Sequence, residues 1–524
     1  MTSSYACLKA ILSDWRKIET VCRTTCRALS SVAPFQRNPM SSGRKLGDEA
    51  ASRLASRATL ATTARTINPT KMKTPLNHLH TARFSPAIFC AALVSTLVFS
   101  ANVLRADETC SSPYLARIDG QEEFVYVWTL GVEGMGDGSD KLVTVDVKPG
   151  SPSYGRVVSS SSVDGRNEAH HGGFTDDRRQ LWLAGLESSR VFIFDVHTNP
   201  AKPKLTRTID NFAETTGGAV GPHGAYALPG RVLIPCLSNA KDKGGKTALV
   251  EYGNDGNYIT THWLPTKEDA RGASGAEFAD GYGYDARILP RKNALLTSSF
   301  TGWNNYTMDF GKLTADPEAM KHFGNTMVMW DFHARQPKKV FEVPGAPLEI
   351  RWAWGDKHNY AFTATALASK LWLVYADDRG EWQAKEVAPI SDIKGGVLPV
   401  DISISADDKT LFVDCFGDGK CRVFDISDPQ KPKQIYEKQI GRQVNMVSQS
   451  WDGKRLYFTS SLLARWDKQG VDNEQFLRGY AWDGKELKPA FDLDFTALKL
   501  GRPHHMLFGS TKIGANRTTV ASIR

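Results

Sequence analysis

Beyond residue 106 the sequence lacks an excess of charge of either sign. Residues 1–106 hold 15 Lys and Arg against 4 Asp and Glu, a net charge of +11, whereas the whole chain of 524 residues has a net charge of +8. The remaining residues therefore hold 50 basic and 53 acidic side chains, a net charge of −3. Binding of nucleic acid through charge needs a basic surface. We therefore expect no nucleic-acid partner.

The composition also lacks the biases of non-globular proteins. Charged residues make up 23% and hydrophobic residues 41% of the chain, which excludes collagen-like, coiled-coil and wholly disordered classes. Few stretches after residue 106 have the periodicity of an amphipathic helix. Short apolar runs closed by turn residues dominate instead, and this pattern is typical of all-β proteins.

The N-terminal fifth differs from the rest. Residues 1–71 are rich in Ser, Thr, Ala and Arg and lack apolar periodicity, so we expect disorder there, or an extension that is not translated. Residues 72–106 combine a basic start at Met72, an apolar run over 84–104 and a small residue, Ala106. This is the pattern of a Sec signal peptide and predicts export to the periplasm. A membrane anchor is the alternative, because the apolar run is long.

Cysteine is sparse in the exported part. Four of the eight cysteines, Cys7, Cys22, Cys26 and Cys90, precede residue 107. Cys415 and Cys421 flank a Gly/Asp turn and could face each other across a hairpin. An oxidising compartment permits a disulfide there, and a pair of reduced thiols is the alternative, because strand register decides the geometry.

One unit recurs seven times after residue 107: a strand, a polar Pro/Gly/Asn loop and a returning strand. These hairpins begin at Leu142, Val191, Ala248, Met327, Leu371, Cys421 and Gly479. Such units bury their faces only by stacking on copies of themselves. The sequence therefore predicts one all-β domain over 107–524, a seven-bladed β-propeller, with long insertions at 300–326 and 464–478. A pair of β-sandwiches is the alternative.

Histidines occur in two kinds of context. Five stand singly in polar loops or at strand ends: His197, His262, His322, His333 and His358. Three other segments carry His170-His171, His223 and His504-His505, each between an outer hairpin and the next blade, where the chain of a propeller returns to its axis. Imidazoles without an obligatory carboxylate favour copper or zinc. Unrelated packing of these side chains is the alternative.

Several segments, in this order, resemble the selenium-binding protein / methanethiol oxidase family. They are GMGDGSDKLVTVDV from Gly134, EAHHGGF from Glu168, GPHGAY from Gly221, GAPLEIRW from Gly345, LPVDISISADDKTLFV from Leu398, RVFDISDPQKPK from Arg422 and SWDGKRLYFTSSLLARWDKQ from Ser450. The resemblance implies a seven-bladed propeller and a copper-dependent methanethiol oxidase. That reaction converts methanethiol, O2 and water to formaldehyde, hydrogen sulfide and hydrogen peroxide. It also implies copper ligands at His170, His171, His223 and His504.

The sequence departs from the family pattern at three places. Many members have a Trp and a Cys-rich stretch after the paired histidines, where this chain has Phe174 and no Cys over 175–179, which argues against covalent selenium binding. Tyr226 and Asp418 stand where the family has further histidines. With His505 they are the candidates for proton transfer. A non-catalytic periplasmic copper- or selenium-binding propeller and a plain interaction scaffold are the alternative functions.

Overall fold

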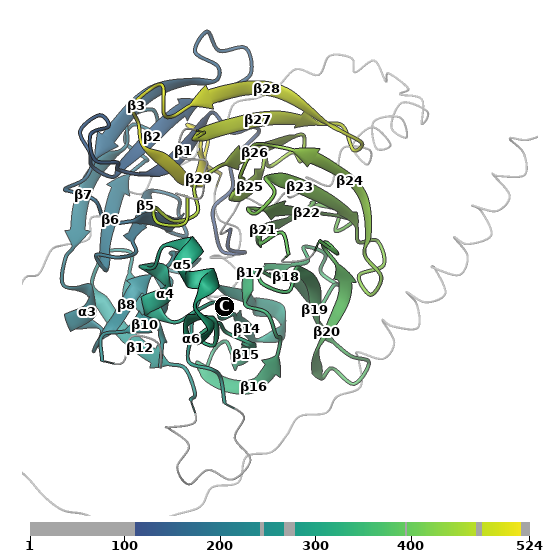
Figure 1. Cartoon of the computed structure of the whole chain (residues 1–524). Coiled ribbons are helices and arrows are strands. Elements are labelled where there is room, and N and C mark those ends of the chain that lie inside the picture. Colours follow the sequence, from purple (N-terminus) through teal and green to yellow (C-terminus); the bar gives the residue numbers. More distant parts are fainter. Residues whose placement is uncertain (1–110, 242–245, 267–277, 394–395, 468–473, 515–524) are drawn as a thin grey trace, which may run out of the picture. The chain divides into compact units, whose positions relative to one another are not determined.

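Seven antiparallel sheets stand in a ring in the computed structural model (Figure 1). The structure describes residues 111–241, 246–266, 278–393, 396–467 and 474–514. The predicted disordered extension, signal peptide and cleavage site lie outside the described residues. The prediction of an all-β, seven-bladed β-propeller is confirmed.

Each blade is one sheet, described here from its innermost strand outward. Blade 1 is β29 (Arg502–Gly509), β1 (Phe124–Leu130), β2 (Lys141–Asp146) and β3 (Arg156–Ser162). Blade 2 is β4 (Ala169–Phe174), β5 (Gln180–Gly185), β6 (Arg190–Asp195) and β7 (Lys204–Ile209). Blade 3 is β8 (Ala219–Pro222) with β9 (Tyr226–Leu228), then β10 (Arg231–Asn239), β11 (Ala248–Gly253) and β12 (Tyr258–Trp263). Blade 4 is β13 (Ala286–Leu289), β14 (Ala294–Thr297), β15 (Thr326–Asp331) and β16 (Gln336–Glu342).

The last three blades have the same order. Blade 5 is β17 (Pro347–Trp352), β18 (Tyr360–Thr365), β19 (Lys370–Ala376) and β20 (Trp382–Pro389). Blade 6 is β21 (Pro399–Ile404), β22 (Thr410–Cys415), β23 (Lys420–Asp425) and β24 (Lys433–Gln439). Blade 7 is β25 (Met446–Gln449), β26 (Arg455–Thr459), β27 (Phe476–Trp482) and β28 (Leu487–Asp494).

The seven predicted hairpins form the two outer strands of the seven blades. The hairpin predicted from Leu142 is β2–β3, for example, and the one from Gly479 is β27–β28. The ring closes because β29, the last strand, pairs with β1, the first (Figure 1). This closure leaves each sheet packed between two neighbours, so its faces are buried, as a propeller requires.

Apolar side chains on both faces of the inner strands form the core. Cys415 belongs to a buried cluster with Leu373 and Ile402, whereas Cys421 belongs to another cluster with Phe458 and Phe476. The register explains the separation: Cys415 is opposite Lys420, and Cys421 is opposite Asp414. Because alternate residues of a strand point to opposite faces, the two sulfurs lie on opposite sides of the sheet. Both cysteines are free, and the predicted alternative of a disulfide is wrong.

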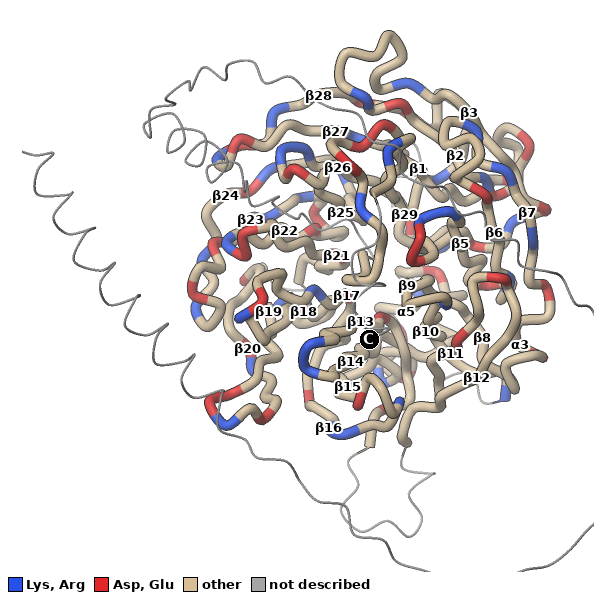
Figure 2. Tube along the Cα trace, turned by 180° about the vertical axis from the view of Figure 1, so that it is seen from behind, with Lys and Arg blue, Asp and Glu red and all other residues tan. Residues whose placement is uncertain are grey.

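Helical segments are few and short among the described residues. They are α3 (Phe212–Thr215), α4 (Trp303–Tyr306), α5 (Phe310–Ala315), α6 (Pro317–Met320) and the 3₁₀ turn η1 (Pro290–Lys292). None of these segments has the length and apolar character needed to cross a bilayer. The insertion predicted over 300–326 contains α4, α5 and α6, which lie near the centre of the ring in Figure 1. Lys and Arg alternate with Asp and Glu around the outer strands (Figure 2).

Candidate metal centre

The paired histidines of β4 reach the propeller axis because the strand carries a β-bulge. Ala169 is opposite Gly185 and Gly172 is opposite Leu183, so three steps along β4 match two steps along β5. The extra residue breaks the alternation of side chains and re-aims them. Both His170 and His171 are therefore buried, each 1% exposed, although neighbours in a regular strand would point to opposite faces.

A β-bulge also turns the second histidine pair inward. Trp128 is opposite His505 and Thr129 is opposite Pro503, which leaves His504 as the extra residue of a bulge in β29. His504 and His505 are buried. His223 comes from the short segment between β8 and β9, where its backbone N–H donates to the Pro235 carbonyl at 2.8 Å.

The five histidines form one compact group, called the histidine cluster below: His170, His171, His223, His504 and His505. Ring centroids are 3.9 Å apart for His170 and His504, and 4.1 Å apart for His171 and His223. The His170 ring lies 4.9 Å from the His171 ring and 5.0 Å from the His223 ring. The structure thus brings together all four predicted ligands, from three blades. Ring nitrogens of His170, His171 and His504 lie within 4.8 Å of one another, close enough to share a metal ion.

Two glycines after the first pair allow this close approach. A Cβ on Gly173 would lie 1.7 Å from the carbonyl oxygen of Ala225, and a Cβ on Gly172 would lie 2.6 Å from the carbonyl oxygen of Trp182. The backbone of β4 is therefore in direct contact with the segment that carries His223.

We expect Gly173→Ala to push β4 away from the His223 segment. Overpacking of this kind costs about 1–3 kcal/mol, and it should also weaken metal binding, because His171 and His223 would separate. Gly224→Ala is the matched control, since its Cβ would meet only the His171 Cβ at 3.5 Å, an ordinary contact. Thermal unfolding and metal titration of both variants check this, and equal behaviour of the two would contradict it.

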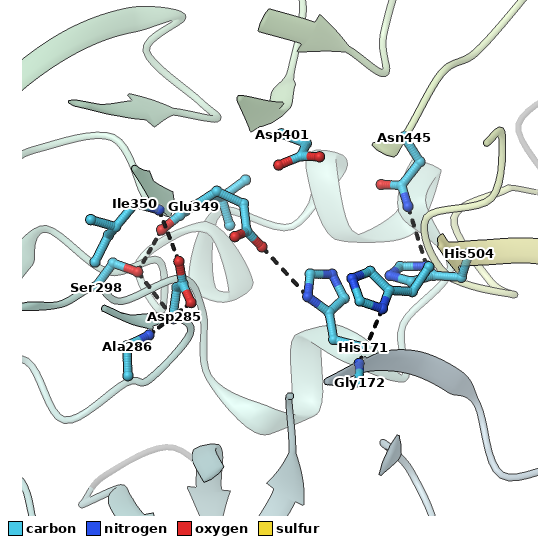
Figure 3. A network of polar contacts seen from close by, with 12 residues as sticks. His171, Gly172, Asp285, Ala286, Ser298, Glu349, Ile350, Asp401, Asn445 and His504 are labelled. Carbon is cyan, nitrogen blue, oxygen red and sulfur yellow. Dashed lines mark hydrogen bonds and ion pairs between the residues drawn. The ribbon is translucent and has the colours of Figure 1, made fainter. Parts of the chain in front are cut away.

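A hydrogen bond fixes the tautomer of one predicted ligand, His223. The bond joins its ring to the backbone of Tyr284 and raises the pKa of His223, although burial lowers that pKa more. Hydrogen bonds that raise the pKa of a histidine are bonds that it donates. Nε2 of His223 has no hydrogen-bond partner. A neutral ring that donates through one nitrogen offers the lone pair of the other to a metal. His504 differs, because its Nδ1 lies 3.3 Å from the side-chain amide nitrogen of Asn445 (Figure 3).

His505 has the opposite arrangement. The backbone N–H of Gly172 donates to its Nδ1 at 3.2 Å. Because a neutral imidazole has one N–H and one lone pair, its proton is on Nε2, and that nitrogen is buried without a hydrogen-bond partner. His505 is therefore built to donate a hydrogen bond into the cluster, and its lone pair is not available to a metal.

Burial keeps the cluster uncharged. It lowers the pKa of His223 to about 4 and that of His504 to about 3. Burial also lowers the pKa values of His170, His171 and His505 well below the usual value, and the neighbouring histidines lower them further. All five rings are therefore neutral at pH 7, which is the form that ligates metals.

A network of buried charges lies beside the histidines, and Figure 3 shows three of its carboxyl groups, those of Asp285, Glu349 and Asp401. Arg287 of β13 donates to Asp285 at 2.8 Å and to Glu349 at 3.1 Å. Arg351 of β17 donates to Glu349 and to Asp401 of β21, at 2.8 Å in each case. The network links blades 4, 5 and 6, and Figure 3 shows Glu349 pointing from it toward His171.

The three carboxyl groups of this network differ in pKa. Burial alone would raise the pKa of Glu349, but Arg351 and Arg287 outweigh it and lower that pKa to about 2. Burial raises the pKa of Asp285 to about 7 and that of Asp401 well above its usual value. Glu349 is therefore the carboxylate that stays ionised beside the histidines.

Glu349 and its partners were not among the site residues expected from the sequence. The signal was present: Glu349 and Arg351 alternate within an otherwise apolar strand, as do Asp285 and Arg287 at the start of β13. Charged side chains at alternate positions of a buried strand share one face and must be paired. A bulge in β17, between Pro347 and Ile350, then places Glu349 at the axis.

An apolar layer covers the cluster. Tyr284 lies 4.0 Å from the His223 ring, centroid to centroid, and stacks edge-on with Phe300 at 5.5 Å. Phe300 in turn contacts Tyr306 of α4 and Trp466. These residues belong to one buried cluster that includes Leu313 of α5 and Ala319 of α6. The insertion therefore shields the histidines with aromatic and aliphatic side chains.

Two of the three proton-transfer candidates lie outside the cluster. Tyr226 is buried beneath the Arg287 guanidinium, 5.2 Å from its ring, and burial raises its pKa. Asp418 is at the β22–β23 turn, where it pairs with Arg422 at 2.6 Å. Neither arrangement suits proton transfer at the histidines, whereas His505 is within the cluster.

Three of the five histidines that stand singly in the sequence contact other polar side chains. His358 contacts Asp408 at 2.6 Å, His262 contacts Glu251 at 3.2 Å, and Nδ1 of His322 contacts the Tyr282 hydroxyl at 3.2 Å. His197 and His333 are exposed, as expected.

Comparisons with known proteins agree on one family. The model of the 56 kDa selenium-binding protein family matches residues 104–481. A methanethiol oxidase of Ruegeria pomeroyi is 63% identical over 429 residues, 82% of this chain and 98% of its own. A methanethiol oxidase of a Hyphomicrobium species is 56% identical over 418 residues, 79% of this chain and 94% of its own. A hypothetical selenium-binding protein of Sulfolobus tokodaii has the same fold, with a TM-score of 0.66 at 22% identity over 77% of this chain and 98% of its own.

Proposed function

Because the chain belongs to the 56 kDa selenium-binding protein family, we propose that it is a copper-dependent methanethiol oxidase. The proposed reaction converts methanethiol, O2 and water to formaldehyde, hydrogen sulfide and hydrogen peroxide. The observation that carries the proposal is the histidine cluster, four of whose members are the residues that the family resemblance assigns to the metal. Two relatives with 63% and 56% identity bear the name methanethiol oxidase.

The residues present fit a copper ion. His223 and His504 have buried Nε2 atoms without a hydrogen-bond partner, and His170 has neither nitrogen satisfied. Buried polar atoms left unsatisfied cost about 1–3 kcal/mol each, a cost that a bound cation would remove. Neutral imidazoles suit copper among other metals. We assign His170, His171, His223 and His504 as the ligands.

The other side chains act around this centre. Copper bound here would supply a thiophilic redox centre that accepts electrons from the thiol and passes them to O2. The layer formed by Tyr284, Phe300 and Trp466 excludes water and offers an apolar surface to the methyl group of the substrate. His505 donates its Nε2–H to a group bound at the cluster, so we assign it, rather than Tyr226 or Asp418, to hold the proton that the reaction moves.

An oxygen electrode tests the proposal. The copper-loaded protein should consume O2 when methanethiol is added and release formaldehyde and sulfide in equal amounts. Protein stripped with a chelator should be inactive until copper is restored. A non-catalytic copper-binding propeller would bind the metal without consuming O2, and that result would overturn the proposal. Covalent selenium binding has little support at Cys236, Cys415 and Cys421, because burial raises the pKa of each thiol.

We further propose that the enzyme is exported to the periplasm, and that the mature domain begins near Asp107 and runs to residue 524. Translation from Met72 should leave export and activity unchanged, because the proposed signal peptide begins at Met72 and the proposed mature domain near Asp107. N-terminal sequencing of the periplasmic protein should give a start near Asp107. An intact apolar segment over 84–104 would instead indicate a membrane anchor, and loss of export on deletion of 1–71 would show that the extension is needed.

A further inference from the structure

Glu349 is a buried side chain at the axis to which neither the family resemblance nor the proposed reaction gives a role. It extends from the bulge at the start of β17 and is 1% exposed. The bulge turns the carboxylate of Glu349 out of blade 5 and toward the histidines of blades 2 and 3 (Figure 3).

The two oxygens of Glu349 have different surroundings. Oε2 accepts from Arg351 at 2.8 Å and from Arg287 at 3.1 Å. Oε1 is buried and has no hydrogen-bond partner. Its near neighbour is Nδ1 of His171 at 3.6 Å, which is too far for a hydrogen bond. One half of an ionised carboxylate is thus anchored by two guanidinium groups, while the other half is desolvated and faces the cluster.

An unsatisfied anionic oxygen in such a place calls for a cation. Leaving one oxygen of a buried carboxylate without a hydrogen-bond partner costs more than leaving a neutral polar atom unsatisfied. Oε1 and ring nitrogens of His171 and His223 all lie within 4.8 Å of one another. Ligands that each lie about 2.0–2.2 Å from one ion are at most about 4.4 Å apart, so small side-chain shifts bring all three onto one metal.

We propose that Glu349 is a ligand of the metal, so that the centre is held by histidines and one carboxylate rather than by histidines alone. This inference rests on the proposed copper centre and adds to it the residue that sets its charge. Arg287 and Arg351 are then positioning residues, because they fix Oε2 and thereby aim Oε1. Such outer contacts commonly fix the orientation of metal ligands.

The chemistry of this ligand has a measurable consequence. A carboxylate is a harder donor than imidazole and carries a negative charge, so it stabilises Cu(II) more than Cu(I). Removing the charge should therefore weaken Cu(II) binding more than Cu(I) binding and raise the reduction potential. Loss of a purely structural residue would weaken both by a similar factor.

The test is Glu349→Gln in the full chain, with Cu(I) and Cu(II) affinities measured by competition against chelators and the potential measured by spectroelectrochemistry. We expect Cu(II) affinity to fall about tenfold or more, as for loss of a contact that supports a metal site, with a clearly smaller fall for Cu(I). Glu349→Asp keeps the negative charge between the two arginines, but its shorter side chain withdraws the carboxylate oxygen from the histidine cluster. This variant should therefore fold, and its Cu(II) affinity should also fall more than its Cu(I) affinity. The control is Glu251→Gln on β11, which also removes a buried carboxylate that two arginines hold, Arg335 at 2.7 Å and Arg231 at 3.0 Å.

The outcomes separate the two claims. Equal losses of Cu(I) and Cu(II) affinity with an unchanged potential in both variants would overturn the ligand role and leave Glu349 as a residue that orients His171. A wild-type protein that binds no copper would overturn the proposed function itself. A change of potential in Glu251→Gln as large as that in Glu349→Gln would also contradict the proposal, since the effect would then follow from the loss of any buried charge.

Discussion

Replacing His223 by Ala should remove the bound copper and lower methanethiol oxidation by more than ~100-fold, since even loss of an outer contact to a metal ligand costs ~10–100-fold. The reason is the tautomer of His223: its ring N–H donates to the backbone of Tyr284, so the lone pair of Nε2 is available to the metal. Metal analysis of the purified variant and an oxygen electrode measure both effects. His333→Ala, at an exposed loop residue, should change neither.

His505 supplies a sharper comparison for that result. It is as deeply buried as His223, but its lone pair accepts the N–H of Gly172. His505→Gln should therefore keep the copper while lowering activity. Because His223 is fully buried, its replacement by Ala leaves a cavity, and His223→Gln is the variant that separates loss of the ligand from loss of packing. Equal copper contents in wild type, His223→Ala and His223→Gln would contradict the assignment of His223.

Copper should stay bound at pH 5 as firmly as at pH 7. Burial lowers the folded pKa of His223 to about 4 and that of His504 to about 3, so these ligands remain deprotonated until the pH falls through that range. A ligand with the usual pKa of about 6.5 would lose about 2 kcal/mol of binding free energy at pH 5, and four such ligands about 8 kcal/mol. The copper affinity is constant above this range because protons compete with the metal only below the pKa that the histidine has in the folded protein.

Equilibrium dialysis against buffered copper between pH 7 and pH 3.5 measures this. We expect a nearly constant affinity down to about pH 5 and release below about pH 4. A histidine tag on the same protein is the internal comparison, because the copper affinity of its exposed imidazoles should start to fall as the pH drops below about 6.5. Release from the cluster with a midpoint near pH 6 would contradict the picture of neutral, desolvated rings.

The outer hairpin of each blade was predictable from the sequence because its turn is local. Pro, Gly and Asn in each loop close the hairpins at β2–β3 and β27–β28 whatever happens elsewhere in the chain. The closure of the ring was harder to predict, since it depends on pairing β29 with β1 across nearly the whole domain. The choice between a Cys415–Cys421 disulfide and two reduced thiols stayed open for a similar reason: a register displaced by one residue moves a side chain to the other face.

The site was predictable in its residue types and not in its geometry. The contexts of His170, His223 and His504 indicated one shared location, and the ring of His170 lies 5.0 Å from that of His223 and 3.9 Å from that of His504. The bulges in β4 and β29, which turn both members of each histidine pair inward, leave no mark that single-sequence patterns detect. The separate role of His505 depends on one backbone contact with Gly172, and the approach of Glu349 depends on a bulge in another blade.

The most direct test of the copper centre is an anomalous difference map of crystals of the copper-loaded protein, recorded at the copper absorption edge. We expect one strong peak on the propeller axis, within about 2.0–2.2 Å of Nε2 of His223 and of ring nitrogens of His170, His171 and His504. A peak at any other place, or crystals of fully active protein without a peak among these four side chains, would contradict it.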